Sequence, residues 1–242
     1  MNLLNSKVLH HRCALILLSV LLASNVDVLA DGVVIDRIYD PYVQALETEI
    51  EWRSISQSNK RDFDDAQLHK LGIGKSINDI WFAEIYLIGE RNEDNSLGID
   101  AIEIESKLQL TEQGEYSADW GILFELERSR LQKSWEVKTG LLTVKEWGRW
   151  VGTSNIVAIY EWGDYIDNEF ETKLALQLRY RYSKRFEPAL EFHTGQNNHG
   201  IGPLIMGTES FDGAKKLSWE LGFIFGLDGS DHTLKTSLEY EF

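Results

Sequence analysis

The chain has 242 residues, of which 43% are hydrophobic and 26% are charged, so it can bury a core, and a disordered or collagen-like chain is excluded. It carries 24 Lys and Arg residues against 39 Asp and Glu residues, a formal net charge of −15. Nucleic-acid binding draws its affinity from clustered Lys and Arg, so this acidic balance argues against a nucleic-acid partner.

The first 30 residues have the layout of a secretory signal peptide. Lys7 and Arg12 precede an apolar stretch at 13–24, and Ala30 ends a small-residue site. The alternative is a membrane anchor, but an apolar run of about 12 residues is shorter than the roughly 20 that a helix needs to cross a bilayer. We therefore predict a signal peptide at 1–30 and one exported domain at 31–242, in which residues 31–42 form a short periplasmic lead-in.

Beyond residue 42 the chain alternates between apolar and polar residues with period two, which is typical of strands with two unlike faces. In the clearest run, 115–127, Trp120 and Ile122 alternate with Asp119 and Gly121. Short polar turns separate the runs, and no linker, low-complexity stretch or shift in composition interrupts them. In chain order the predicted strands are 43–55, 66–75, 80–90, 101–111, 115–127, 133–144, 154–162, 171–182, 186–194, 201–209, 216–227 and 234–242.

Three features favour a membrane barrel over a soluble β-sandwich, the alternative that the same alternation allows. Several runs reach the roughly 9 to 11 residues that a tilted strand needs to cross a membrane. The polar faces carry acids and bases in rows, such as Glu47, Glu49, Glu51 and Arg53, which suit a lumen. Aromatic residues near predicted strand ends suit the membrane interface, namely Trp52, Trp81, Trp135 and Trp162. We therefore predict an all-β fold, an antiparallel up-and-down transmembrane β-barrel of about twelve strands, with about 10 to 14 as the range.

The C-terminal residues resemble the closing strand of Gram-negative outer-membrane β-barrels. Phe242 ends the chain, and Tyr240 and Leu238 stand two and four positions before it. In that family the terminal motif is read by the barrel-assembly machinery, which implies that these three residues act as an assembly signal. The resemblance implies a monomer in the bacterial outer membrane, with lipid and the assembly machinery as partners, and it implies no activity.

The polar faces of the predicted strands supply the candidate lumen-lining residues. Acids outnumber bases on these faces, and all the loops are short, so no folded plug is expected. We predict a small pore for passive passage of ions or small solutes, with a weak preference for cations. The candidates are Glu103, Glu105, Lys107, Asp119, Glu125, Glu127, Glu171, Lys173, Arg179, Arg181, Glu191 and His193.

Catalytic and metal-binding motifs are scarce in the exported part of the chain. Its histidines, at 69, 193, 199 and 232, occur without an HExxH or GxSxG pattern. Outer-membrane phospholipases resemble the predicted fold, so a lipid-active hydrolase remains an alternative, as does a closed structural or interaction barrel. His193 and His199, with Glu191 and Met206 nearby, offer ligands that suit copper but lack a metal-site spacing. We predict no metal, no cofactor and no catalytic residue.

Overall fold

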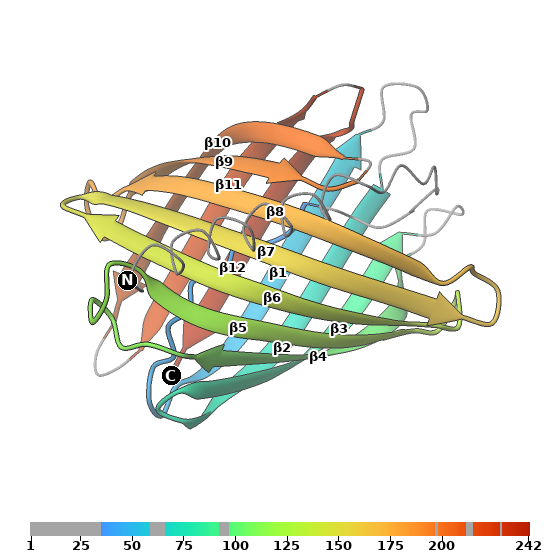
Figure 1. Ribbon diagram of the computed structural model, residues 1–242, viewed down its shortest axis with the longest axis horizontal. Coiled ribbons are helices and arrows are strands. Elements are labelled where there is room, and N and C mark those ends of the chain that lie inside the picture. The colour runs from blue at the N-terminus through green and yellow to red at the C-terminus, as the bar shows by residue number, and fades with distance from the viewer. Residues whose placement is uncertain (1–34, 59–65, 92–96, 197, 212–214, 228) are drawn as a thin grey trace, which may run out of the picture. The chain divides into compact units, whose positions relative to one another are not determined.

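The computed structural model describes residues 35–242 except 59–65, 92–96, 197, 212–214 and 228. The described residues form one closed antiparallel barrel of twelve strands, in which each strand pairs with the next along the chain and β12 pairs with β1 (Figure 1). The prediction of an all-β barrel of about twelve strands is confirmed. The strands are β1 (Thr48–Ser58), β2 (Ala66–Asn78), β3 (Trp81–Arg91), β4 (Leu97–Gln109), β5 (Asp119–Ser129), β6 (Ser134–Trp147), β7 (Trp150–Gly163), β8 (Glu169–Tyr180), β9 (Glu187–Thr194), β10 (His199–Ser210), β11 (Lys216–Gly226) and β12 (His232–Glu241).

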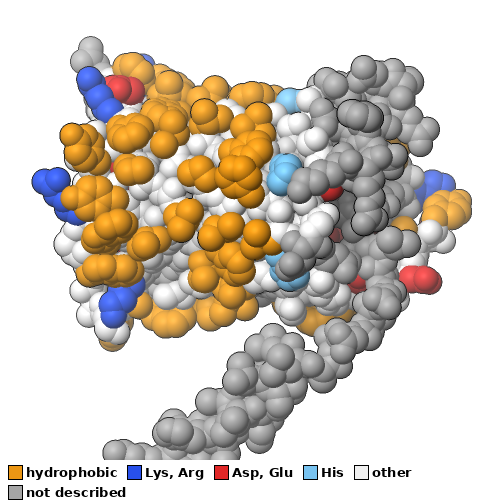
Figure 2. Space-filling model, turned by 90° about the horizontal axis from the view of Figure 1, so that it is seen from above, with side chains coloured by type: hydrophobic (Ala, Val, Ile, Leu, Met, Phe, Trp, Pro, Cys, Tyr) orange, Lys and Arg blue, Asp and Glu red, His pale blue; other side chains and the backbone are white. Residues whose placement is uncertain are grey.

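The two faces of each strand differ as the alternation predicts. On β5, Leu123 and Glu125 point inward and are buried, whereas Ile122 and Phe124 point outward and are 36% and 45% exposed. Figure 2 shows such hydrophobic side chains spread over the outside of the barrel, with Lys and Arg side chains towards its ends. An apolar outer surface of this extent fits hydrocarbon rather than water.

Strand length also fits a membrane. β6 and β7 have 14 residues each, and at about 3.3 Å per residue they exceed the roughly 30 Å of hydrocarbon even when tilted. Gly148 has a φ of 65° and allows the tight turn that joins them. No helix among the described residues is long and apolar enough to cross a membrane.

Several strand ends differ from the predicted ones because of local backbone geometry. β1 begins at Thr48 rather than at residue 43, since Leu46 has a φ of 65° that interrupts the extended chain. β5 begins at Asp119 rather than at 115, because Gly114, with a φ of 75°, opens a turn that continues to residue 118. The gap between the strands predicted at 133–144 and 154–162 shrinks to residues 148 and 149. The loops that follow the strands predicted at 43–55 and 80–90 lie partly outside the described residues.

The last strand closes the barrel at the end where β1 begins, which we call the terminal end. Leu238 and Tyr240 face outward, and the backbone N–H of Phe242 donates a hydrogen bond of 2.9 Å to the carbonyl of Thr48. The role of these residues as an assembly signal stays a prediction.

Of the four tryptophans predicted at the membrane interface, Trp81, Trp135 and Trp162 lie within one residue of a strand end. Trp52 lies inside β1 instead, and its ring stacks on His69 with the centroids 6.0 Å apart. The strand-end argument for an interface position therefore holds for three of these residues and not for Trp52.

Candidate functional site

A short stretch of chain that precedes β1 lies inside the barrel; we call residues 35–43 the luminal segment. Arg37 pairs with Glu51 on β1, whereas the backbone of Tyr39 is held by Asn155 on β7. In the closed ring five strands separate β1 from β7 in either direction, so the segment spans the lumen. The expectation of a periplasmic lead-in at 31–42 is wrong for residues 35–42, which lie in the lumen; residues 31–34 lie outside the described residues.

Ion pairs hold the inner part of the luminal segment. The Asp36 carboxylate lies 3.3 Å from Nζ of Lys70 and 3.5 Å from Nη1 of Arg53, and the Arg37 guanidinium lies 2.9 Å from Glu51 and 2.7 Å from Glu239. Burial raises the pKa of Asp36, but attraction by Lys70 and Arg53 outweighs it and holds that pKa well below its ordinary value. Asp36 is therefore ionised at neutral pH, and its pairs with both bases persist.

Tyr39 is fixed by both its backbone and its side chain. Its N–H donates to Oδ1 of Asn155 at 2.7 Å, and its carbonyl accepts from Nδ2 of the same residue at 2.8 Å. The Tyr39 hydroxyl donates to Glu105 at 2.8 Å and accepts from Arg53 at 2.9 Å. Asn155 thus supplies the two hydrogen bonds that a neighbouring strand would give to a buried backbone.

The outer part of the segment leaves the lumen at the terminal end. The Tyr42 hydroxyl donates to Asp119 at 2.7 Å, and the N–H of Val43 donates to Gln109 at 2.8 Å. Pro41 packs against Gly121, where an added Cβ would lie 2.8 Å from the proline Cβ. Glycine at 121 is therefore needed for the segment to lie against β5.

Acids and bases on the inner wall of β2, β4, β5 and β6 form ion pairs within and between strands. Nζ of Lys70 lies 3.1 Å from Glu103, and Nζ of Lys138 lies 3.2 Å from Glu125 and 2.8 Å from Glu136. Unpaired buried ions would cost several kcal/mol each, whereas close pairs with further hydrogen bonds offset that cost. Glu103, Glu125 and Glu136 are thus compensated by the lysines beside them.

A second charged group lies on β9 and β12. Glu191 lies 2.7 Å from Nζ of Lys235 and 3.1 Å from Nε2 of His193, and it accepts a hydrogen bond from Gln177 at 2.9 Å.

The copper alternative needs His193, His199, Glu191 and Met206 to converge. His199 instead forms a 2.7 Å hydrogen bond with Thr194, and the Met206 sulfur accepts one from Arg179 at 3.4 Å. Only Glu191 and His193 contact each other in these interactions. The structure does not gather the four side chains into a ligand set.

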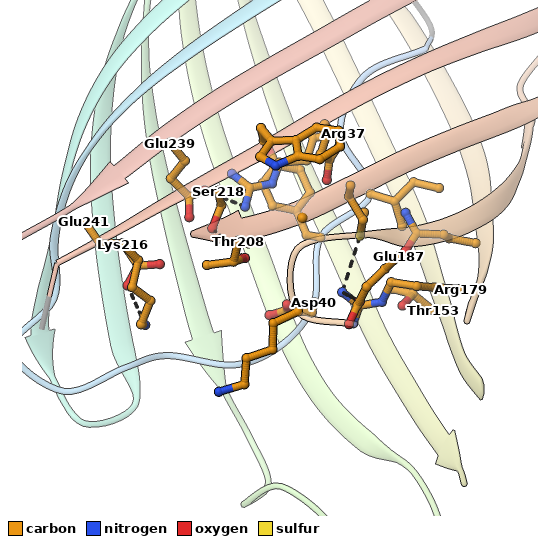
Figure 3. Close-up of a pocket in the computed structure, with 18 of the residues that line it drawn as sticks. Arg37, Asp40, Thr153, Arg179, Glu187, Thr208, Lys216, Ser218, Glu239 and Glu241 are labelled. Carbon is orange, nitrogen blue, oxygen red and sulfur yellow. Dashed lines mark hydrogen bonds and ion pairs between the residues drawn. The ribbon is translucent and has the colours of Figure 1, made fainter. Parts of the chain in front are cut away.

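The lumen keeps a cavity of about 420 Å³ beside the luminal segment, shown in Figure 3. Thr153, Gln177, Thr208 and Ser218 supply neutral polar groups to its wall. Two ion pairs border it, Arg179 with Glu187 at 3.2 Å and Lys216 with Glu241 at 2.8 Å. The remaining charged lining residues are Arg37, Asp40, Lys107, Arg181, Lys184, Glu220 and Glu239.

The structure separates the lumen-lining candidates into groups. Three of them, Lys107, Arg179 and Arg181, line the cavity, while Arg181 also pairs with Glu146 at 2.6 Å. Six are buried in the inner wall, namely Glu103, Glu105, Asp119, Glu125, Glu191 and His193. Glu127, Glu171 and Lys173 share the inward alternation and are partly exposed.

Sequence reasoning missed Lys70, Tyr86, Asn155 and the luminal segment. Lys70 on β2 and Asn155 on β7 are among the residues that point inward, so applying the alternation to every residue of the predicted strands could have found them. Nothing in the pattern of residues 35–43 indicates that they enter the lumen, because their partners are dispersed over several strands.

No protein-family model and no curated protein sequence matches this chain. Solved structures do match by fold. The chain is similar to the "COG4313 outer membrane channel from Pseudomonas putida F1", with a TM-score of 0.59 and 12% identity, covering 86% of this chain and 100% of that chain. It is also similar to the "KdgM porin in complex with disordered oligogalacturonate", with a TM-score of 0.55 and 12% identity over 80% of this chain and 99% of that chain. With its closed ring of strands and apolar outer face, the chain is folded as a bacterial outer-membrane β-barrel.

Proposed function

We propose that this protein is an outer-membrane channel for the passive passage of ions and small polar solutes, with the luminal segment narrowing the path. The observation that carries the proposal is the cavity of about 420 Å³, lined by hydroxyl, amide and charged groups within a closed barrel. In narrower barrels side chains fill the interior, whereas this barrel keeps a polar space that small solutes can enter.

The luminal segment limits what can pass. It crosses the barrel and bonds to walls on both sides, so the path runs between the segment and the wall that includes Thr153, Gln177 and Ser218. The cavity volume lies within the range of about 300–1,000 Å³ that is typical of small-molecule sites. The proposed solutes are therefore of the size of a small sugar or an amino acid, and folded macromolecules are too large.

We further propose a monomer with its terminal end towards the periplasm and a weak preference for cations. The cavity wall holds charges of both signs, since Asp40 and Glu220 are acids, and Lys107 and Lys184 are bases, outside the ion pairs described above. The proposed cation preference therefore rests on the excess of acids over bases on the inner faces of the strands as a whole. Charges in a low-dielectric wall act strongly on passing ions, and salt screens them, since the Debye length falls from about 10 Å at 0.1 M to about 3 Å at 1 M.

Two sets of substitutions test this path: one removes negative charges from the cavity wall, and the other removes a positive charge. In a salt gradient across a planar bilayer, Asp40→Asn with Glu220→Gln should lower the cation preference, whereas Lys107→Gln should raise it, and both shifts should shrink at high salt. If neither set moves the reversal potential of a conducting protein, ions do not pass the cavity. Shifts with the opposite signs would contradict the proposed selectivity.

A further inference from the structure

Two buried carboxylates at the terminal end approach each other across β2, at a position where β2 has a glycine and therefore no side chain between them. Glu49 of β1 and Glu84 of β3 are both partners of Gly74 on β2, so the three residues form one row across neighbouring strands. Both acids point into the lumen and are only 5% and 2% exposed. A Cβ on Gly74 would lie 3.2 Å from Cδ of Glu84, so glycine leaves the room that the Glu84 carboxyl uses.

A third carboxylate, from Glu51, completes the group. One oxygen from each of Glu49, Glu51 and Glu84 lies within 4.8 Å of the other two. Glu84 leans over Gly72, the residue paired with Glu51, since an added Cβ on Gly72 would collide with Oε1 of Glu84. The Glu84 carboxyl is therefore directed towards Glu51.

The three acids differ in how their charge is compensated. Glu51 is held by Arg37 at 2.9 Å and Arg53 at 2.8 Å. Among the described residues, no Lys or Arg nitrogen lies within 4.0 Å of Glu49 or Glu84. Oε1 of Glu84 is buried and has no hydrogen-bond partner there either.

Neighbouring groups add negative charge. β12 places Glu241 opposite Glu49 and Glu239 opposite Glu51, and these two acids already use Lys216 and Arg37. Leaving Glu49 and Glu84 ionised without a counter-charge would cost several kcal/mol for each. Two such carboxyls must either take up a proton or bind a cation, and no Lys or Arg in the described part of the chain lies close enough to supply that charge.

We propose that Glu49, Glu84 and Glu51 bind one calcium ion. Carboxylate oxygens are the ligands that hard divalent cations prefer, and Ca²⁺ takes them at about 2.3–2.6 Å, so oxygens up to roughly 5 Å apart can share one ion. Mg²⁺ needs ligands at about 2.0–2.1 Å in near-ideal octahedral geometry and fits this spacing less well. Glu49 and Glu84 supply the unpaired charge. Arg37 contacts one carboxylate oxygen of Glu51 and Arg53 contacts the other, so the Glu51 side chain is held in place beside the ion. The ion would join β1 to β3 across β2 at the terminal end, a role separate from solute passage.

The test uses the full-length protein in detergent, with Tb³⁺ as a luminescent probe excited through nearby tyrosines such as Tyr86, whose hydroxyl lies 2.6 Å from Glu51. Tb³⁺ emission should rise on binding and fall on addition of Ca²⁺, with Mg²⁺ competing at least tenfold more weakly. Ca²⁺ should also raise the temperature at which the folded band is lost on electrophoresis.

Glu49→Gln and Glu84→Gln should each weaken Ca²⁺ competition at least tenfold and reduce the thermal shift. Glu171→Gln, which removes a lumen acid of β8 outside the group, should leave both unchanged. The site is refuted if millimolar Ca²⁺ neither displaces Tb³⁺ nor raises the unfolding temperature. It is equally refuted if the three variants respond alike, or if Mg²⁺ competes as well as Ca²⁺.

Discussion

Replacing Arg53 with methionine should destabilise the barrel by about 3–5 kcal/mol, because it leaves buried carboxylates without their shared base. The Arg53 side chain is 3% exposed, and its guanidinium lies 2.8 Å from Glu51, 3.5 Å from Asp36 and 3.8 Å from Glu105. Methionine retains most of the apolar stem, so the loss isolates the charge and its hydrogen bonds. Urea unfolding in detergent micelles measures the change in the free energy of unfolding.

Arg185→Met is the matched control. Arg185 also pairs with a glutamate, Glu209, at 3.0 Å, but its side chain is 78% exposed. Solvent-exposed pairs contribute about 0–1 kcal/mol, so this change should have little effect. Equal losses for Arg53→Met and Arg185→Met would mean that water fills the lumen around Arg53 and screens its charges.

Placing an arginine on the outer face in the middle of β11 should cost about 2–4 kcal/mol if that face meets hydrocarbon. Leu221 lies halfway along the strand, faces outward and is 44% exposed. Leu221→Arg should therefore lower the free energy of unfolding in lipid bilayers by that amount. On the same strand, Ser218 faces the cavity, so Ser218→Arg should be mild by comparison. If Ser218→Arg costs as much as Leu221→Arg, the inward and outward faces are misassigned.

Much of the fold could be predicted from the sequence, because in a strand with one apolar and one polar face the alternation of residue types shows which side chains point inward and which point outward. The alternation around Ile122 and Phe124 predicted β5 and its lipid face, and Phe242 marked the closing strand. Strand ends were less accurate, since they depend on single backbone angles such as those of Leu46 and Gly114. Such backbone angles do not change the alternation of apolar and polar residues, so the sequence pattern does not indicate them.

The site was less predictable than the fold. The alternation showed that acids such as Glu103 and Glu125 face inward, but their pairing with Lys70 and Lys138 depends on cross-strand register. The path of the luminal segment depends on contacts with residues as distant in sequence as Asn155. Such contacts follow from closure of the ring and not from any local pattern.

The central claim is that a conducting path runs beside the luminal segment, and single-channel conductance in planar bilayers tests it most directly. The wild-type protein should conduct in small steps, and a variant lacking residues 35–42 should conduct in steps at least twice as large, because the deletion removes chain that spans the lumen. Heat-modifiable migration on electrophoresis would verify that the variant is folded. Equal conductance of the two folded proteins, or none from either, would contradict the account.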